Sequence, residues 1–128
     1  MEILASRMLL RPADYRRSVD FYRDGIGLAI AREYGAGTVF YAGQSLIEIA
    51  GHGAPPAGPA PFPGALWLQV RDVYATEYEL ASRGVEIARE ARREPWGLDE
   101  MQVTDPDGVT LIFVQVPEDH PLRRDTRG

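Results

Sequence analysis

The chain contains no cysteine and only two histidines, which limits the chemistry that its side chains can carry. Without cysteine, disulfide bonds, thiolate catalysis and zinc–sulfur sites are excluded. No apolar run approaches the ~20 residues that a membrane-spanning helix needs. Glu2 and Arg7 interrupt the region where a signal peptide would be apolar. These absences predict a cytoplasmic protein without a membrane association.

The chain also has no excess of basic charge, because 19 acidic residues outnumber 14 basic ones and give a formal net charge of −5. Nucleic-acid binding without sequence preference requires a basic surface, so this class of partner is not expected. The sequence has no phosphate-binding glycine loop, nucleophile elbow or Ser–His–Asp set. A hydrophobic content of 45% in 128 residues instead indicates one soluble domain, or two small modules that share a core.

One order of elements occurs twice along the chain. An apolar strand is followed by an aspartate that caps a helix, then by a glycine and further strands. The capping residues Asp14 and Asp72 are 58 positions apart, as are Arg7 and Ala65 in the two leading strands. Two copies at this distance indicate a duplicated supersecondary unit, since a solenoid needs three or more repeats.

Hydrophobic periodicity and turn residues predict the bounds of each element. In a first module, residues 1–50, we expect a buried strand at 2–10, then a helix after Asp14. Three strands follow, at 28–34, 37–42 and 44–50. In a second, residues 64–117, we expect the same order, with strands at 65–70, 85–92, 98–104 and 109–116. A Pro/Gly-rich linker, 51–63, joins them, and 118–128 form a polar tail.

The segments RSVDFYRDGIGL, PWG and DPDGVTLIFVQ resemble the vicinal oxygen chelate (VOC) superfamily, which includes glyoxalase I, bleomycin-resistance proteins and extradiol dioxygenases. The resemblance spans residues 3–116. It implies an α+β fold in which two βαβββ modules form one VOC domain with a curled mixed-sheet cup. It also implies a homodimer as the expected assembly.

In metal-dependent members, this resemblance implies four ligand positions, which fall here on Arg7, Glu48, Ala65 and Ile112. Only Glu48 has a side chain that can bind a metal, and a catalytic metal normally has at least three protein ligands. We therefore expect no metal and no other cofactor. The alternative is that His52 in the linker or His120 in the tail completes a site with Glu48.

Strand alternation predicts which side chains line the cup. The candidate ligand-binding residues are Arg7, Glu48, Trp67, Gln69, Thr110 and Ile112, with Trp96 on a loop at the mouth. Apolar walls with a few polar groups are typical of small-molecule pockets. Alternatives remain open for several residues. Arg7 either pairs with Glu48 or reaches solvent. Each tryptophan either contacts ligand or has a structural role, Trp67 in the core or a dimer interface and Trp96 in stabilising its turn.

Two further assignments are left open by the pattern. Tyr34, Phe40 and Tyr41 lie on the first module's strands, but periodicity does not decide which of them faces inward. The charged run 89–94 is either an edge strand protected by charge or a basic rim for an anionic ligand. We favour the protected edge.

The function predicted from these residues is sequestration of a small organic molecule, such as an antibiotic or a toxic metabolite, without catalysis. The alternative is a VOC enzyme: a lyase, isomerase or dioxygenase that uses an unusual metal site, or Glu48 as general base. A third interpretation is a regulatory or protein-interaction domain whose cup is filled by its own side chains.

Overall fold

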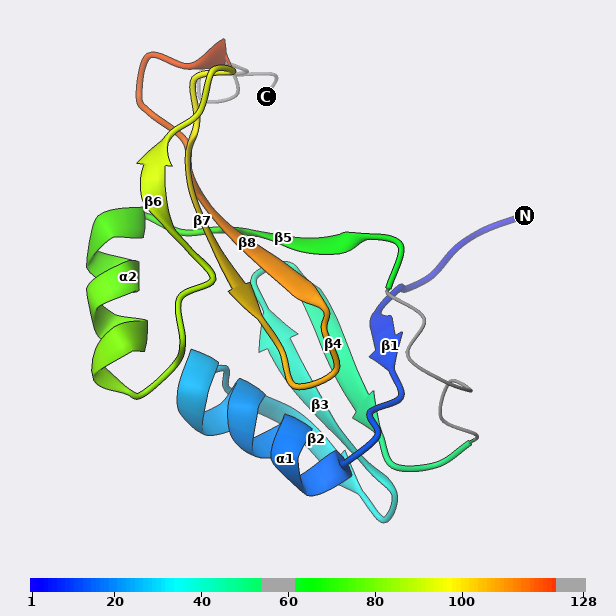
Figure 1. Ribbon diagram of the computed structural model, residues 1–128. Helices are drawn as coiled ribbons and strands as arrows, with labels where there is room; N and C mark the ends of the chain where they lie inside the picture. Colours follow the sequence, from blue (N-terminus) through cyan, green and yellow to red (C-terminus); the bar gives the residue numbers. More distant parts are fainter. Residues whose placement is uncertain (54–61, 122–128) are drawn as a thin grey trace. The chain divides into compact units, whose positions relative to one another are not determined.

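The computed structural model describes residues 1–53 and 62–121. The chain divides into two compact units (Figure 1). Unit 1 comprises Met1–Phe62 and Asp105–Gly108, and unit 2 comprises Pro63–Thr104 and Val109–Gly128. Most of the expected linker and tail, residues 54–61 and 122–128, lies outside the described residues.

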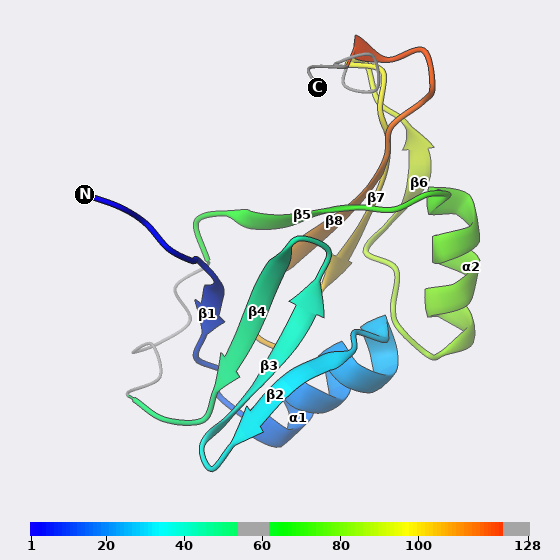
Figure 2. The same ribbon diagram turned by 180° about the vertical axis from the view of Figure 1, so that it is seen from behind.

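Unit 1 contains a four-stranded mixed sheet in the order β1-β4-β3-β2. Its strands are β1 (Met8–Leu10), β2 (Ile30–Tyr34), β3 (Gly37–Ala42) and β4 (Ser45–Ala50). β1 is parallel to β4, and the other neighbours are antiparallel. Figure 2 shows the sheet with the helix α1 behind it, so one face is covered by helix and the other is helix-free.

The helix of unit 1 has two parts, an α-helix α1 (Tyr15–Asp20) and a π-helix η1 (Phe21–Ile26). The Asp14 carboxylate caps α1 by accepting a hydrogen bond from the Arg17 N–H, as the sequence predicts. Gly27 ends η1 in the left-handed conformation, at φ 86°. The predicted apolar face is confirmed, because Val19, Tyr22 and Ile26 are all buried.

Unit 2 repeats the topology with the sheet order β5-β8-β7-β6. The strands are β5 (Ala65–Gln69), β6 (Arg89–Arg93), β7 (Asp99–Thr104) and β8 (Thr110–Gln115), and the helix is α2 (Val73–Ser82). Asp72 caps α2 by accepting hydrogen bonds from two backbone N–H groups. Gln115 fixes the start of α2 on the sheet, because its side-chain oxygen accepts from the Val73 N–H at 2.9 Å.

The Asp105–Gly108 turn joins β7 to β8 in sequence but groups with unit 1. Asp107 accepts hydrogen bonds from the Ala13 N–H at 2.9 Å and the Ser18 hydroxyl at 3.0 Å. The buried Tyr22 hydroxyl donates to Asp105 at 2.7 Å. The DPDG motif therefore supplies acceptors to the helix of the other half of the sequence, which its turn-forming residues alone do not indicate.

The predicted α+β class with two βαβββ modules is confirmed, as two separate, open four-stranded mixed sheets, each with its own helix. Two strand predictions were wrong at their ends. The strand expected at 2–10 is reduced to Met8–Leu10, because its pairing with β4 extends over only three residues. The strand expected at 85–92 begins at Arg89 and contains a register shift before Arg92. No helix in the described ranges is long and apolar enough to cross a membrane.

Candidate ligand-binding residues

Glu48 lies on the helix-free face of the unit 1 sheet. It is in register with Leu9 on β1 and Val39 on β3, and residues paired across strands share a face. Its neighbours Ile47 and Ile49 point to the opposite face and are buried under the helix. The alternation that predicted an inward Glu48 is thus present in the structure.

Arg7 and Glu48 form an ion pair, with Arg7 Nη1 3.0 Å from Glu48 Oε1. The Glu48 residue is only 7% exposed, whereas the Arg7 side chain is 37% exposed. Of the two alternatives for Arg7, the structure shows pairing with Glu48. Arg7 lies immediately before β1, not within a long strand as expected.

Tyr34 supplies a second donor to Glu48 that the sequence did not single out. Its hydroxyl donates a short hydrogen bond to Glu48 Oε2. Tyr34 is in register with Gly37 across the β2–β3 hairpin, and a Cβ atom at Gly37 would overlap the phenol ring. The glycine therefore allows the ring to lie across β3 toward Glu48. The Tyr-Gly-Ala-Gly hairpin sequence was the available signal.

The other two aromatic residues of these strands now have defined positions. Phe40 is fully buried on the helix side, with its ring centroid 6.3 Å from that of Tyr22. Tyr41 pairs with Leu46 on the Glu48 face and remains 55% exposed.

His52 lies just after β4 and extends the cluster. Its Nε2 is 3.0 Å from the Tyr34 hydroxyl and 3.9 Å from Glu48 Oε2. Because the Tyr34 hydroxyl has one proton, which it donates to Glu48, the contact with His52 assigns the Nε2 proton as the donor to Tyr34. We call Arg7, Tyr34, Glu48 and His52 the Glu48 cluster.

Hydrogen bonding favours the ionised form of Glu48. The Tyr34 hydroxyl lowers the pKa of Glu48 most strongly; Arg7 adds to this effect, and desolvation opposes it. The same hydrogen bond raises the pKa of the Tyr34 phenol. The cluster thus holds an anionic carboxylate and a neutral phenol at neutral pH.

This donor set does not fit a catalytic metal. Within residues 1–53 and 62–121, no group of three or more His, Asp or Glu side chains is arranged to hold an ion. Glu48 is the only carboxylate and His52 the only imidazole in the cluster, and the Arg7 cation occupies one Glu48 oxygen. His120 lies in unit 2, with Nε2 3.2 Å from the Trp96 carbonyl oxygen.

In unit 2, four predicted site residues lie on one face of the β5–β8 strand pair. Trp67 and Gln69 are exposed along β5, with the buried Leu66 on the other face. Trp67 is in register with Ile112, and Ala65 is in register with Thr110. Trp67 is 49% exposed, so its interpretation as a core residue was wrong. A role for it in a dimer interface stays a prediction.

Trp96 combines a structural hydrogen bond with an exposed ring. Its indole N–H donates to Glu100 Oε2 at 2.6 Å, while the residue is 58% exposed. Glu100 is only 6% exposed. The sequence did not single it out, because its hydrogen-bond partner Trp96 lies on a loop whose path the strand pattern does not predict. Both features of Trp96 considered from the sequence, turn stabilisation and an accessible ring, are therefore present.

The charged run 89–94 includes the edge strand β6, as favoured from the sequence. Its arginines are paired with neighbouring carboxylates: Arg89 with Glu94 at 2.5 Å, and Arg93 with Asp99 at 2.6 Å. These pairs neutralise much of the basic charge that a rim for an anionic ligand would need.

The predicted site residues thus fall into separate groups. Arg7 and Glu48 are in contact in unit 1, whereas Trp67, Gln69, Thr110 and Ile112 share the β5–β8 face in unit 2, and Trp96 is on a loop of that unit. The structure assigns no ligand-binding role to any of them. That role stays a prediction.

Comparison with known proteins gives the family. Residues 5–113 match the model of the Glyoxalase/Bleomycin resistance protein/Dioxygenase superfamily. The chain belongs to this superfamily, as its resemblance to VOC proteins predicted. Among curated proteins, none matches the chain significantly.

Solved structures confirm the fold at low sequence identity. A glyoxalase/bleomycin resistance protein/dioxygenase from Nocardioides is 15% identical, with a TM-score of 0.72 over 94% of this chain and 89% of that one. A protein of the same description from Alicyclobacillus acidocaldarius is 19% identical, with a TM-score of 0.69 over 90% and 92%. A glyoxalase-related enzyme from Fulvimarina pelagi is 22% identical, with a TM-score of 0.71 over 91% and 90%.

Proposed function

We propose that this protein binds and sequesters a small organic molecule on the helix-free faces of its sheets, without a metal. The observation that carries the proposal is the make-up of the unit 1 face. A buried, ionised Glu48 is held by three polar neighbours and is flanked on the sheet by the partly exposed Leu9 and Tyr41. Few, fixed polar groups among apolar surfaces are the usual composition of a small-molecule site.

The unit 2 face supports the same proposal with a different residue set. Trp67 offers a half-exposed indole beside Gln69, an uncharged hydrogen-bonding group, and Ile112. Trp96 offers a second exposed ring that its hydrogen bond to Glu100 holds in place. Rigid aromatic rings of this kind stack on planar or cationic ligands. An aromatic antibiotic or metabolite, preferably cationic given the net charge of −5, is the proposed ligand class.

Catalysis with Glu48 as general base is the less favoured candidate. A general base works best with a pKa near the operating pH, and the Tyr34 and Arg7 hydrogen bonds move the pKa of Glu48 the other way. The carboxylate is therefore suited to accept hydrogen bonds from a ligand more than to remove a proton from it. The proposal also includes a homodimer, on family resemblance alone, and a cytoplasmic location, on the sequence alone.

Tryptophan fluorescence tests the proposal, because the chain has only Trp67 and Trp96 as indoles. A panel of aromatic antibiotics, cationic and neutral, is titrated into the wild type and into the single-tryptophan variants Trp67→Phe and Trp96→Phe. We expect saturable quenching by at least one cationic compound. Absence of quenching across the panel would argue against binding of this ligand class on the unit 2 face.

Metal analysis separates the proposal from the enzyme alternative. Purified, untagged protein is incubated with nickel, zinc, manganese or ferrous iron, desalted and analysed for metal. We expect less than about a tenth of an equivalent, because one carboxylate and one imidazole are too few ligands. Stoichiometric metal that is lost in Glu48→Ala would favour a metal-dependent enzyme instead.

A further inference from the structure

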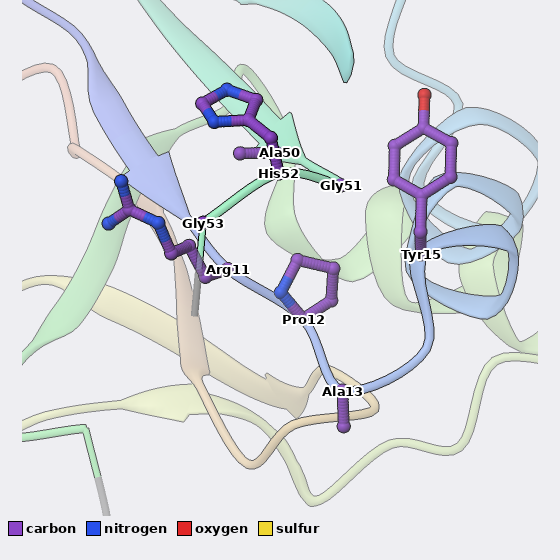
Figure 3. Close-up of a pocket in the computed structure, with 8 residues that line it drawn as sticks. All are labelled: Arg11, Pro12, Ala13, Tyr15, Ala50, Gly51, His52 and Gly53. Atoms are coloured by element: carbon purple, nitrogen blue, oxygen red, sulfur yellow. The ribbon is translucent and has the colours of Figure 1, made fainter. Parts of the chain in front are cut away.

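A cavity of about 190 Å³ lies in unit 1 beside the loop after β4. Figure 3 shows its lining side chains, which come from two segments of the chain. The segment between β1 and the helix contributes Arg11, Pro12, Ala13 and Tyr15, and the end of β4 with its following loop contributes Ala50, Gly51, His52 and Gly53. Apart from His52, none of these residues belongs to the Glu48 cluster.

The two glycines that flank His52 shape the cavity. A Cβ atom at Gly51 would lie 3.1 Å from the Ala36 carbonyl oxygen and 3.3 Å from a ring carbon of Tyr15. A Cβ atom at Gly53 would lie 2.5 Å from Arg11 Nε, and Gly53 also has a left-handed φ of +79°. The Gly-His-Gly sequence therefore lets the Tyr15 ring and the Arg11 side chain approach the loop backbone closely.

Arg11 gives the cavity a permanent positive charge. In the described part of the chain, Arg11 has no carboxylate partner, unlike Arg7, Arg23, Arg83, Arg89, Arg92 and Arg93. An exposed guanidinium that lies beside a glycine and a cavity, without a carboxylate partner in the described residues, is a ready donor to a planar anionic group. In Figure 3 the Arg11 guanidinium lies on the opposite side of the view from the Tyr15 ring.

We propose that this cavity binds a small monocarboxylate. The carboxylate accepts hydrogen bonds from the Arg11 guanidinium, and its short carbon chain packs against Pro12. A monoanion matches the single permanent cation. A dianion such as phosphate is disfavoured, because the Asp107 carboxylate lies near the Ala13 side, where it accepts from the Ala13 N–H. This site goes beyond the proposed function, since it uses neither the tryptophans nor Glu48.

Acetate is the probe for this site, and NMR amide shifts are the readout. Sodium acetate replaces sodium chloride at constant ionic strength, while the amides of Ala13, Gly51 and Gly53 are followed. We expect saturable shifts at these amides with a Kd of about 1–10 mM, a range suited to so small a ligand. Shifts that do not saturate, or that are absent from these amides, would overturn the proposal.

Two variants locate the charge. Arg11→Gln should weaken acetate binding at least about tenfold, which corresponds to about 1.4 kcal/mol. The matched control Arg16→Gln removes an exposed arginine of α1 outside the cavity lining and should leave the Kd unchanged. Equal weakening by both variants would show a non-specific charge effect and overturn the proposal.

Gly53→Ala keeps every charge but displaces Arg11, so it should also weaken binding. Thermal unfolding checks that each variant is folded. If Gly53→Ala does not fold, Arg11→Lys replaces it as the test of geometry, because lysine keeps the charge but has a different arrangement of donors. Undiminished binding in the folded positional variant would overturn the assignment of Arg11 geometry. Inorganic phosphate in place of acetate should bind more weakly, and tighter phosphate binding would overturn the monocarboxylate class. All of these readouts are independent of tryptophan quenching.

Discussion

Tyr34 lies across Gly37, at the place where a side chain on Gly37 would overlap the phenol ring. The two residues are paired in register at the end of the β2–β3 hairpin. This relationship directs the Tyr34 hydroxyl to Glu48 and thereby sets the charge state of the candidate site. A glycine on one strand thus positions a tyrosine of the next strand against a carboxylate of a third.

Gly37→Ala should displace Tyr34 from Glu48 and destabilise the protein by about 1–3 kcal/mol, the usual cost of overpacking. Urea unfolding measures the change. Gly35→Ala is the matched control in the same hairpin, because a Cβ atom there meets nothing within 4 Å and its φ is not left-handed. We expect Gly35→Ala to be neutral or slightly stabilising. Equal destabilisation by both substitutions would contradict the steric role of Tyr34.

Glu48→Gln should reduce the dependence of stability on acidic pH. The folded-state pKa of Glu48 is lowered, so its contribution is present above its ordinary pKa and is lost as pH falls through the folded value. Unfolding free energies between about pH 7 and pH 3 should therefore fall less steeply in Glu48→Gln than in the wild type. The exposed Glu2→Gln is the control and should follow the wild-type curve.

Tyr34→Phe should change how the stability of the protein depends on alkaline pH. The pKa of Tyr34 is raised, chiefly by its hydrogen bond to Glu48, so its contribution is present below the ordinary phenol pKa and is lost as pH rises through the folded value. The variant should be less stable than the wild type at neutral pH, and the difference should shrink above about pH 10. A constant difference across this range would show that the hydroxyl acts through packing alone. Urea unfolding at each pH provides the data.

Tyr22→Phe should destabilise the protein by about 1.5–3 kcal/mol, the range for a hydrogen bond to a charged group. Tyr22 is fully buried, and its hydroxyl donates to the 5%-exposed Asp105. Tyr41→Phe, at a 55%-exposed position, is the control and should change stability little. If Tyr22→Phe is as stable as the wild type, the Asp105–Gly108 turn is not held by this hydrogen bond.

Local signals in the sequence were sufficient to predict the two modules and the face of the sheet on which Glu48 lies. Capping by Asp14 and Asp72 depends on neighbouring backbone groups, and strand alternation fixes faces without knowledge of the partner strands. Non-local pairing could not be read in the same way. The register that brings Tyr34 over Gly37 and the contact between Tyr22 and Asp105 arise only when separate segments meet.

The shortened first strand has the same kind of cause. Residues 2–7 are mostly suited to a strand, but β1 gains hydrogen bonds from β4 over only three residue pairs. His52 was considered only as a metal ligand, because its sequence neighbours are glycines and prolines. Its contact with Tyr34 depends on where the chain turns after β4, and a linker-like composition does not specify that turn.

The most direct test of the account is isothermal titration calorimetry with the panel compound that binds the wild type most tightly. Wild type, Glu48→Gln and the control Glu2→Gln are compared at neutral pH, after each is shown to be folded. We predict metal-independent binding that is weakened at least about tenfold in Glu48→Gln and unchanged in Glu2→Gln. Equal affinity of the wild type and Glu48→Gln would contradict the claim that the Glu48 cluster binds the ligand.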